Sequence, residues 1–259
     1  MASTAEVANL LLESETTVAL TGAGISKASG MPTFRGEDGL WDDEDSSQWA
    51  YRHFFDLDPA AWYEGFWQFY NMHRGLAPSA AHYALRDMVE ASVIDTVVTQ
   101  NVDSFDLMAG TPESKLLEVH GHDRSLSCAD WQEQRCRYTV ATEEWLLAND
   151  QSILPLCPYD GDPLKPDIIL INDTYMPDHV AKAYREAPKI IKAAATLVVV
   201  GTSLEILPWY EAACDFGADE DKSLVVINPD STPIDRLARL VIHSPAEEVL
   251  PEIRNLVVG

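Results

Sequence analysis

Three short apolar runs, each followed directly by small polar residues, constrain the fold of this chain most. They are residues 16–20 with Gly22 and Gly24 after them, residues 196–200 with Gly201, and residues 223–227 with Asn228. Runs of this length, rich in β-branched residues, are typical of strands buried on both faces of a parallel sheet. Ligands of such sheets bind beyond the carboxyl ends of the strands. The pattern therefore predicts a parallel sheet with a binding site at one edge.

The rest of the chain alternates between helical and strand patterns. We expect helices at 7–12, 79–91, 142–148, 181–195 and 245–257, and further strands at 93–99, 116–119 and 168–171. This alternation predicts an α/β fold with a Rossmann-like, doubly wound parallel sheet. We assign that domain to residues 1–35, 78–121 and 166–259. The aromatic-rich helical insertion 36–77 and the polar, irregular, zinc-ribbon-like insertion 122–165 are expected to form a smaller domain.

Composition limits the classes of function. The 259-residue chain is 46% hydrophobic and carries a net charge of -24. It has no apolar run long enough for a membrane span and no secretory leader, so we expect a cytoplasmic protein without a membrane partner. The acidic surface argues against nucleic-acid binding. It fits either basic partners such as histone-like tails or adaptation to concentrated salt, and we favour a halophilic prokaryote. The oligomeric state is not predicted.

Two motifs indicate chemistry on a dinucleotide. Gly22-Ala23-Gly24 offers close backbone approach and free amides to a pyrophosphate. Gln100-Asn101-Val102-Asp103 and then His120 place amides, a carboxylate and an imidazole after two other strands. If all these strands are parallel, the groups meet at the same edge of the sheet.

In this combination the chain resembles the sirtuins, the NAD-dependent protein deacylases of the Sir2 family. The matching segments run in the family's order: Gly22-Ala23-Gly24-Ile25-Ser26, Ser29-Gly30-Met31-Pro32, Phe34-Arg35-Gly36, Thr99-Gln100-Asn101-Val102-Asp103, Ala109-Gly110, His120-Gly121, Gly201-Thr202-Ser203-Leu204 and Asn228. They span residues 22 to 228, which is nearly the whole chain.

The resemblance implies NAD as cofactor and acyl-lysine proteins or peptides as partners. It assigns cofactor contacts to Gly22, Ala23, Gly24, Phe34, Arg35, Gln100, Asn101, Asp103, Gly201, Thr202, Ser203 and Asn228. It implies catalytic roles for Asn101, Asp103 and His120, with His120 as the general base that takes a proton from a ribose hydroxyl. The implied products are nicotinamide, the freed lysine and an O-acyl-ADP-ribose.

The chain departs from the family pattern where the acyl peptide is expected to bind. The segment 165–173, with Ile169, Ile171 and Asn172, stands where the family pairs a strand with the peptide, and Ile171 and Asn172 replace Phe and Gly. Tyr70 and His73 stand where some members carry Tyr-x-x-Arg for acidic acyl groups. We consider either acidic-acyl recognition by these two residues or simple packing on a helix face, and favour packing.

The cysteines leave two alternatives open. The family commonly holds zinc with two Cys-x-x-Cys pairs, whereas here seven residues separate Cys128 from Cys136, and Asp160 stands where the second cysteine after Cys157 would be. These four residues make a tetrahedral zinc site, or the cysteines pack as small apolar side chains without metal. Cys214 is expected in a helix core.

Two other functions compete with deacylation. An NAD glycohydrolase or ADP-ribosyltransferase would use the same nucleotide site and is favoured by the altered peptide segment. A non-catalytic NAD or ADP-ribose sensor would have no use for a base such as His120.

Overall fold

The computed structural model describes residues 2–32, 48–128, 136–173, 176–204 and 206–259. Its main element is a six-stranded sheet with the strand order β3-β2-β1-β7-β8-β9, in which every neighbouring pair is parallel. The strands are β1 (Thr17–Thr21), β2 (Thr96–Thr99), β3 (Leu116–Glu118), β7 (Thr196–Val200), β8 (Ser223–Ile227) and β9 (Leu240–Ile242). The chain reverses its direction of travel across the sheet between β1 and β7. This is the strand order of a doubly wound fold, whose ligand crevice lies at that switch point.

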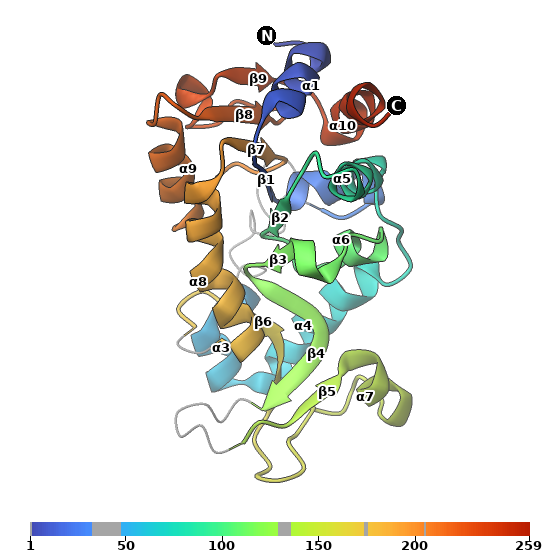
Figure 1. Ribbon diagram of the computed structural model, residues 1–259. Helices are drawn as coiled ribbons and strands as arrows, with labels where there is room; N and C mark the ends of the chain where they lie inside the picture. Colours follow the sequence, from blue (N-terminus) through green and yellow to red (C-terminus); the bar gives the residue numbers. More distant parts are fainter. Residues whose placement is uncertain (1, 33–47, 129–135, 174–175, 205) are drawn as a thin grey trace.

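Helices cover both faces of the sheet (Figure 1). One face packs against α1 (Thr4–Glu13), α5 (Ala80–Glu90) and α10 (Ala246–Val257). The other packs against α8 (Asp178–Ala193) and α9 (Trp209–Gly217). Alternate residues of each strand point to opposite faces, so Ala19 joins the first core and Val18 and Leu20 the second.

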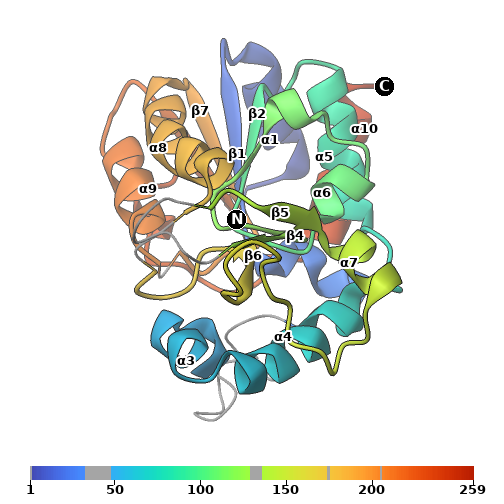
Figure 2. The ribbon, with the colours of Figure 1, turned by 90° about the horizontal axis from the view of Figure 1, so that it is seen from below.

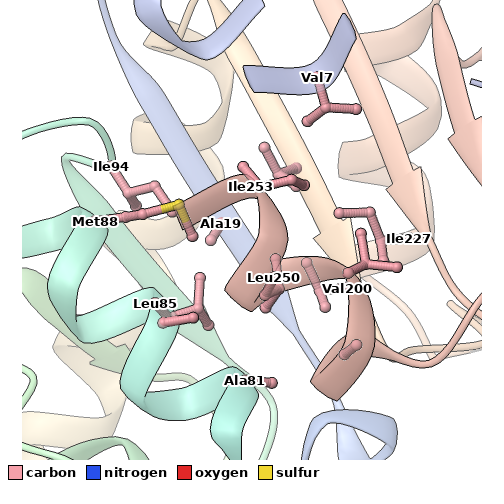
Figure 3. Packing of buried hydrophobic residues seen from close by; sticks show 14 of the residues in the cluster. Val7, Ala19, Ala81, Leu85, Met88, Ile94, Val200, Ile227, Leu250 and Ile253 are labelled. Carbon is pink, nitrogen blue, oxygen red and sulfur yellow. The ribbon is translucent and has the colours of Figure 1, made fainter. Parts of the chain in front are cut away.

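The first core shows why these helices form. Leu85 and Met88 lie one turn apart on α5, and Leu250 and Ile253 do so on α10, so each helix presents an apolar stripe. Figure 3 shows these side chains meeting over Ala19 of β1. All five are at most 1% exposed.

A second, smaller unit, here called the small module, lies beyond the carboxyl ends of the large sheet's central strands (Figure 1). Its antiparallel sheet has the order β5-β4-β6. Its elements are β4 (Gly121–Cys128), β5 (Thr139–Ala141), β6 (Leu164–Ile168), η2 (Gln48–Ala50), α3 (Arg52–Leu57), α4 (Pro59–His73) and α7 (Thr142–Ala148). Figure 2 shows α3 and α4 side by side at the outer end of the molecule.

Aromatic side chains fill the core of the small module. Trp62, Phe66 and Trp67 of α4 are buried, and Trp67 stacks on Trp145 of α7 with ring centroids 5.7 Å apart. Most aromatic side chains of residues 48–77 are therefore core residues of this module. The segment 33–47 lies outside the described residues.

The structure corrects two predictions about strands. Residues 168–171 were expected as a buried parallel strand, but β6 covers 164–168 and pairs antiparallel with β4 in the small sheet. The polar residues Lys165 and Asp167 are buried in this strand because each has a polar partner: Lys165 Nζ lies 3.1 Å from Asp173, and Asp167 accepts a hydrogen bond from Ser125. The stretch after residue 121 was expected to be irregular, yet it begins with the eight-residue strand β4.

The other predicted elements are present, three of them with the expected ends (142–148, 196–200 and 223–227) and the rest with shifted ends. The strand expected at 93–99 begins at Thr96, and the helix expected at 181–195 is α8, which begins at Asp178. Short helical elements follow several strands: η1 (Ala23–Ser29) follows β1, α6 (Phe105–Met108) and η3 (Glu113–Lys115) lie between β2 and β3, and η4 (Asp235–Leu237) lies between β8 and β9. Among the described residues, no helix is long and apolar enough to cross a membrane. The fold class is confirmed, and the domain boundaries stay a prediction.

Candidate active site

The loops after β1 and β7 touch through their glycines. The amide of Gly24 donates to the carbonyl of Gly201 at 2.8 Å, and the amide of Gly22 donates to Val200 at 3.2 Å. A Cβ on Gly24 would lie 2.8 Å from the Gly201 Cα, and one on Gly22 would lie 2.6 Å from the Thr202 Cβ. Gly201 has φ +59°, which also favours glycine. The contact at the switch point therefore requires glycine from both loops.

Side chains from the end of β2 form a buried network beside this contact. Asn101 Nδ2 donates to the Gly22 carbonyl at 3.1 Å and to Ser26 Oγ at 3.2 Å. Ser26 Oγ donates to Asp103 Oδ2 at 2.7 Å. Burial raises the pKa of Asp103, although hydrogen bonds from Ser26 and the Phe105 amide offset part of the rise. The predicted residues Asn101 and Asp103 thus lie close together, and Ser26 is hydrogen-bonded to both.

A small pocket opens at this network. It is lined by Ala23 and Ser26 of η1, by Asn101 and Asp103, and by Phe69 of α4, together with Met31, Pro32 and Val102. The pocket therefore joins the glycine loop, the end of β2 and the small module. We call residues 22–26, 100–103, 120 and 201–203 the nucleotide edge.

The imidazole of His120 lies between two hydrogen-bond partners that fix its tautomer. Its Nδ1 is 2.9 Å from the carbonyl oxygen of Gln100, and its Nε2 is 2.9 Å from the indole Nε1 of Trp209. A carbonyl oxygen only accepts and an indole N–H only donates. Nδ1 therefore carries the proton, and Nε2 presents a lone pair. Burial lowers the pKa of His120 to about 4, so the ring is neutral near pH 7.

Gln100 links this imidazole to the loop after β7. Its side-chain Nε2 donates to Thr202 Oγ1 and to the Thr21 carbonyl, both at 3.2 Å. Its backbone carbonyl accepts the hydrogen bond from His120 Nδ1. Thr202 is buried and Ser203 is exposed. The predicted residues Gln100, Thr202 and His120 therefore form one connected group.

Of the remaining predicted cofactor residues, Ala23 and Asn228 lie within the described part of the chain. Ala23 lines the pocket. Asn228, at the end of β8, is 9% exposed and donates through Nδ2 to the carbonyl of Asp230. Phe34 and Arg35 lie outside the described residues.

Sequence reasoning gave no role to Ser26, His82 and Trp209. Ser26 adjoins the glycine run, so its place beside a phosphate loop was a usable signal. His82 Nε2 lies 3.5 Å from Ser26 Oγ, and burial lowers the pKa of His82 to about 4. Trp209, 0% exposed, meets His120 across 89 residues of sequence, and no local pattern marks such a contact.

The candidate peptide segment after β6 is already paired within the chain. The Ile169 amide donates to the His120 carbonyl at 2.8 Å. The Ile171 amide donates to Ala50, and the Ile171 carbonyl accepts from the Arg52 amide. Asn172 has φ +63°, a left-handed conformation that Asn tolerates better than most residues after glycine. Asn172 is therefore a residue type that suits the left-handed conformation found at this position.

The two residues considered for acyl recognition are helix-packing residues in this structure. Tyr70 and His73 are both buried, and their rings meet edge to face with centroids 5.6 Å apart. His73 Nε2 lies 2.7 Å from Asp123 Oδ2. Burial disfavours the charged ring, but the hydrogen bond and charge of Asp123 outweigh it and raise the pKa of His73. Any charge on His73 is thus committed to Asp123, which supports the packing alternative.

The predicted metal residues converge at the far end of the small sheet. One ligand atom from each of Cys128, Cys136, Cys157 and Asp160 lies within 4.8 Å of the others. Cys136 Sγ is 3.4 Å from Cys157 Sγ, and Cys128 Sγ is 3.3 Å from Asp160 Oδ2. All three cysteines are free thiols. Three thiols and one carboxylate match the donors and number of a structural zinc site. Cys214 lies on α9, away from this cluster.

Comparison with known proteins gives a consistent result. The Sir2 family model matches residues 22–208. An NAD-dependent protein deacetylase of Haloarcula marismortui is 35% identical over 254 residues, covering 95% of this chain and 92% of the relative. An NAD-dependent protein deacylase of Pyrococcus furiosus is 32% identical over 258 residues, covering 96% of this chain and 95% of the relative.

Solved structures agree. A Sir2 homologue bound to NAD superposes with a TM-score of 0.85 at 28% identity, covering 97% of this chain and 93% of that one. A Sir2 complex with a deacetylated p53 peptide and 3'-O-acetyl-ADP-ribose also has a TM-score of 0.85 at 28% identity, with 98% of each chain covered. The family model matches most of this chain, and the relatives align with nearly all of it. This chain therefore belongs to the Sir2 family.

Proposed function

We propose that the chain is an NAD-dependent protein-lysine deacylase that yields nicotinamide and O-acyl-ADP-ribose. The observation that carries this proposal is the tautomer of His120. A neutral imidazole that keeps its proton on Nδ1 and carries a lone pair on Nε2 is what a general base at this place requires. Relatives named as deacetylases and deacylases across the full length support the same activity.

The nucleotide edge fits NAD. The glycines of the β1 and β7 loops leave no room for a Cβ, so the backbone itself forms the surface that a pyrophosphate approaches. Asn101 and Asp103 line the adjoining pocket and offer amide and carboxylate groups to a ribose and a carboxamide. When bound, NAD would supply the ribose, which receives the acyl group on a hydroxyl oxygen, and the nicotinamide that leaves.

His120 would remove one proton during acyl transfer. Its Nδ1–H stays on the Gln100 carbonyl, which orients the ring, while Nε2 accepts the proton of a ribose hydroxyl. The Trp209 indole N–H occupies that lone pair in the structure, so the hydroxyl must replace it. The hydrogen bond that Gln100 also makes to Thr202 couples the base to the loop after β7.

The cysteine cluster fits zinc as a structural ion. Cys128, Cys136, Cys157 and Asp160 would hold it, and all four lie away from the predicted catalytic residues. Zinc there would stabilise the small module by cross-linking β4 to the 136–160 region.

The acceptor is an acyl-lysine peptide or protein, and the proposed setting is the cytoplasm of a salt-adapted cell. In about 1 M salt the Debye length is about 3 Å, so the net charge of -24 would not steer peptides from a distance. The peptide would bind at the segment that contains Ile169, Ile171 and Asn172.

One observation favours an NAD glycohydrolase or ADP-ribosyltransferase as the second candidate. Both backbone groups of Ile171 are bonded to residues 50–52, so this residue has no backbone group left for an added peptide strand. A sensor without catalysis has no such support.

The experiment is an assay of nicotinamide release from NAD in high-salt buffer, with and without acetylated or succinylated lysine peptides. Acyl-dependent release together with O-acyl-ADP-ribose supports the deacylase and ranks the two acyl groups. Release without peptide supports the hydrolase or transferase. Binding of NAD without release contradicts both catalytic proposals.

A further inference from the structure

A second group of ligand-type side chains lies where the small sheet meets α8. His122 comes from β4, Asp167 from β6 and His179 from the first turn of α8. One ligand atom from each lies within 4.8 Å of the other two. His179 Nε2 is 3.8 Å from Asp167 Oδ2, and in Figure 1 the end of α8 that carries His179 approaches β6. None of these residues belongs to the cysteine cluster or to the nucleotide edge.

Two buried atoms of this group lack a hydrogen-bond partner among the described residues. Asp167 is 2% exposed and its Oδ1 has no partner, while Oδ2 accepts from Ser125. His122 is 9% exposed and its Nδ1 has no partner. Buried polar atoms without partners are rare because each loses its hydration without compensation. An ion that both residues ligate would supply the missing interaction.

Ring stacking does not account for these atoms. The imidazoles of His122 and His179 are 5.0 Å apart with an interplanar angle of 19°. Stacking engages the faces of the rings, whereas the unpartnered Nδ1 lies in the ring plane. The charges that act on His122 are those of Arg124, Asp123, Asp167 and His179. Because Asp123 is paired with His73, the Asp167 carboxylate is the anion left for a cation.

We propose that His122, Asp167 and His179 form a second metal site, which holds a divalent transition metal such as Zn²⁺ and fastens α8 to the small sheet. Two imidazoles and one carboxylate are a donor set that Zn²⁺ accepts, whereas Mg²⁺ and Ca²⁺ prefer oxygen alone. Zinc–ligand distances of about 2.0–2.2 Å put ligand atoms about 3.5 Å apart. His179 is half exposed and lies in the first turn of α8, so a change of its side-chain torsions would bring it inward.

This site would stiffen a segment that matters for the candidate active site. β6 leads directly into Ile169, whose amide holds the His120 carbonyl, and α8 begins ten residues after β6 ends. A metal that joins β4, β6 and α8 would fix both ends of that connection. The proposal stands independently of the deacylase activity.

The test is a titration of the metal-free, full-length protein with Co²⁺ in 1 M salt, which screens loose binding to the acidic surface. Cobalt held by the cysteine cluster gives thiolate-to-metal charge-transfer absorption, and cobalt held by nitrogen and oxygen does not. We expect an equivalent of Co²⁺ that binds without the thiolate band. The affinity for this equivalent should fall at least tenfold in His179→Ala. Its binding should disappear in a His122→Ala, His179→Ala double variant.

His53→Ala is the matched control, because His53 is an exposed histidine of α3 outside both clusters. It should keep the equivalent that lacks the thiolate band. Circular dichroism of His179→Ala, a change at a half-exposed position, separates loss of metal from loss of fold. The proposal is overturned if the wild type binds Co²⁺ only with thiolate absorption. It is also overturned if the folded double variant retains the other equivalent.

Discussion

The nucleotide edge and the small module both bury polar side chains, but they satisfy them in different ways. At the nucleotide edge, Asn101 and Asp103 are bonded to Ser26, and His120 lies between Gln100 and Trp209. In the small module and at its contact with α8, thiols, carboxylates and imidazoles face one another across distances that an ion would bridge. The first region satisfies these polar groups within the protein, whereas in the second we propose that metal ions do so. Changes at the edge should therefore alter NAD chemistry, and changes in the module should alter metal content.

His120→Ala should produce the largest effect at the nucleotide edge. We expect kcat for acyl transfer to fall about 10³-fold because the general base is lost, within the range such bases contribute. The Kd for NAD should change less than threefold, since the imidazole contacts protein groups in the free chain. Rapid-quench kinetics and calorimetry measure the two quantities. His53→Ala should leave both unchanged, and substantial acyl transfer by His120→Ala would refute the assigned base.

Asp106 of α6 lies outside the nucleotide edge, and it is a buried carboxylate whose pKa responds to the charge of Asp103. Burial and the charge of Asp103 raise its pKa to about 7, and its Oδ1 has no hydrogen-bond partner among the described residues. The folded state therefore keeps a proton that the unfolded chain loses above pH 4, so this group's contribution to stability falls from about pH 4 to 7. Asp106→Asn should gain roughly 4 kcal/mol over wild type at pH 8 and almost nothing at pH 4.

Urea unfolding at both pH values measures this difference. Asp87 supplies the contrast, because its hydrogen bonds to Arg86 and Arg254 outweigh desolvation and lower its pKa. Its contribution is present above the ordinary carboxyl pKa and is lost as the pH falls below it. Asp87→Asn should thus destabilise at pH 8. Equal stability of Asp106→Asn and wild type at pH 8 would contradict the account of Asp106.

Cys157→Ser should act on the small module. We expect loss of one bound zinc and a fall of about 3 kcal/mol in unfolding free energy, because metal binding there contributes to folding. Metal analysis and thermal unfolding test this. Cys214→Ser is the control, since Cys214 lies on α9 outside the cluster. A Cys157→Ser protein with unchanged zinc would favour the alternative in which these cysteines only pack.

Gly24→Ala should disturb the loop contact of the nucleotide edge. The added Cβ would lie 2.8 Å from Gly201, so the loops must separate, at a cost of about 1–3 kcal/mol in stability. NAD affinity should fall about tenfold or more. Gly75→Ala is the matched control, because a Cβ there meets nothing within 4 Å. Unchanged NAD affinity in a folded Gly24→Ala protein would argue against this loop as the phosphate site.

Trp209→Phe should have the smallest effect. The indole N–H donates to the lone pair that the base needs, and a hydrogen bond of this kind contributes about 1 kcal/mol. Freeing Nε2 should raise kcat about fivefold. Trp67→Phe removes a buried indole N–H that has no partner among the described residues, and should leave kcat unchanged. A fall in kcat for Trp209→Phe alone would mean that Trp209 is needed to orient His120.

The parallel sheet and its edge were predictable because local sequence determines them. The β-branched runs of β1, β7 and β8 are buried on both faces of the sheet. Because these strands are parallel, the polar residues that follow them all lie at the same edge of the sheet. β6 was misplaced because apolar character favoured residues 168–171, whereas the strand contains Lys165 and Asp167, whose burial depends on Asp173 and Ser125. Trp209 and the His122 group depend on contacts between distant segments, which local patterns do not reveal.

The most direct test of the central claim is a mass balance of the wild-type reaction with NAD and an acetyl-lysine peptide in high salt. Mass spectrometry would quantify nicotinamide, deacetylated peptide and O-acetyl-ADP-ribose in one sample. We predict that the three form in equal amounts and that none forms when the peptide carries unmodified lysine. Nicotinamide in excess over deacetylated peptide, or free ADP-ribose as the main product, would contradict the assignment as a deacylase.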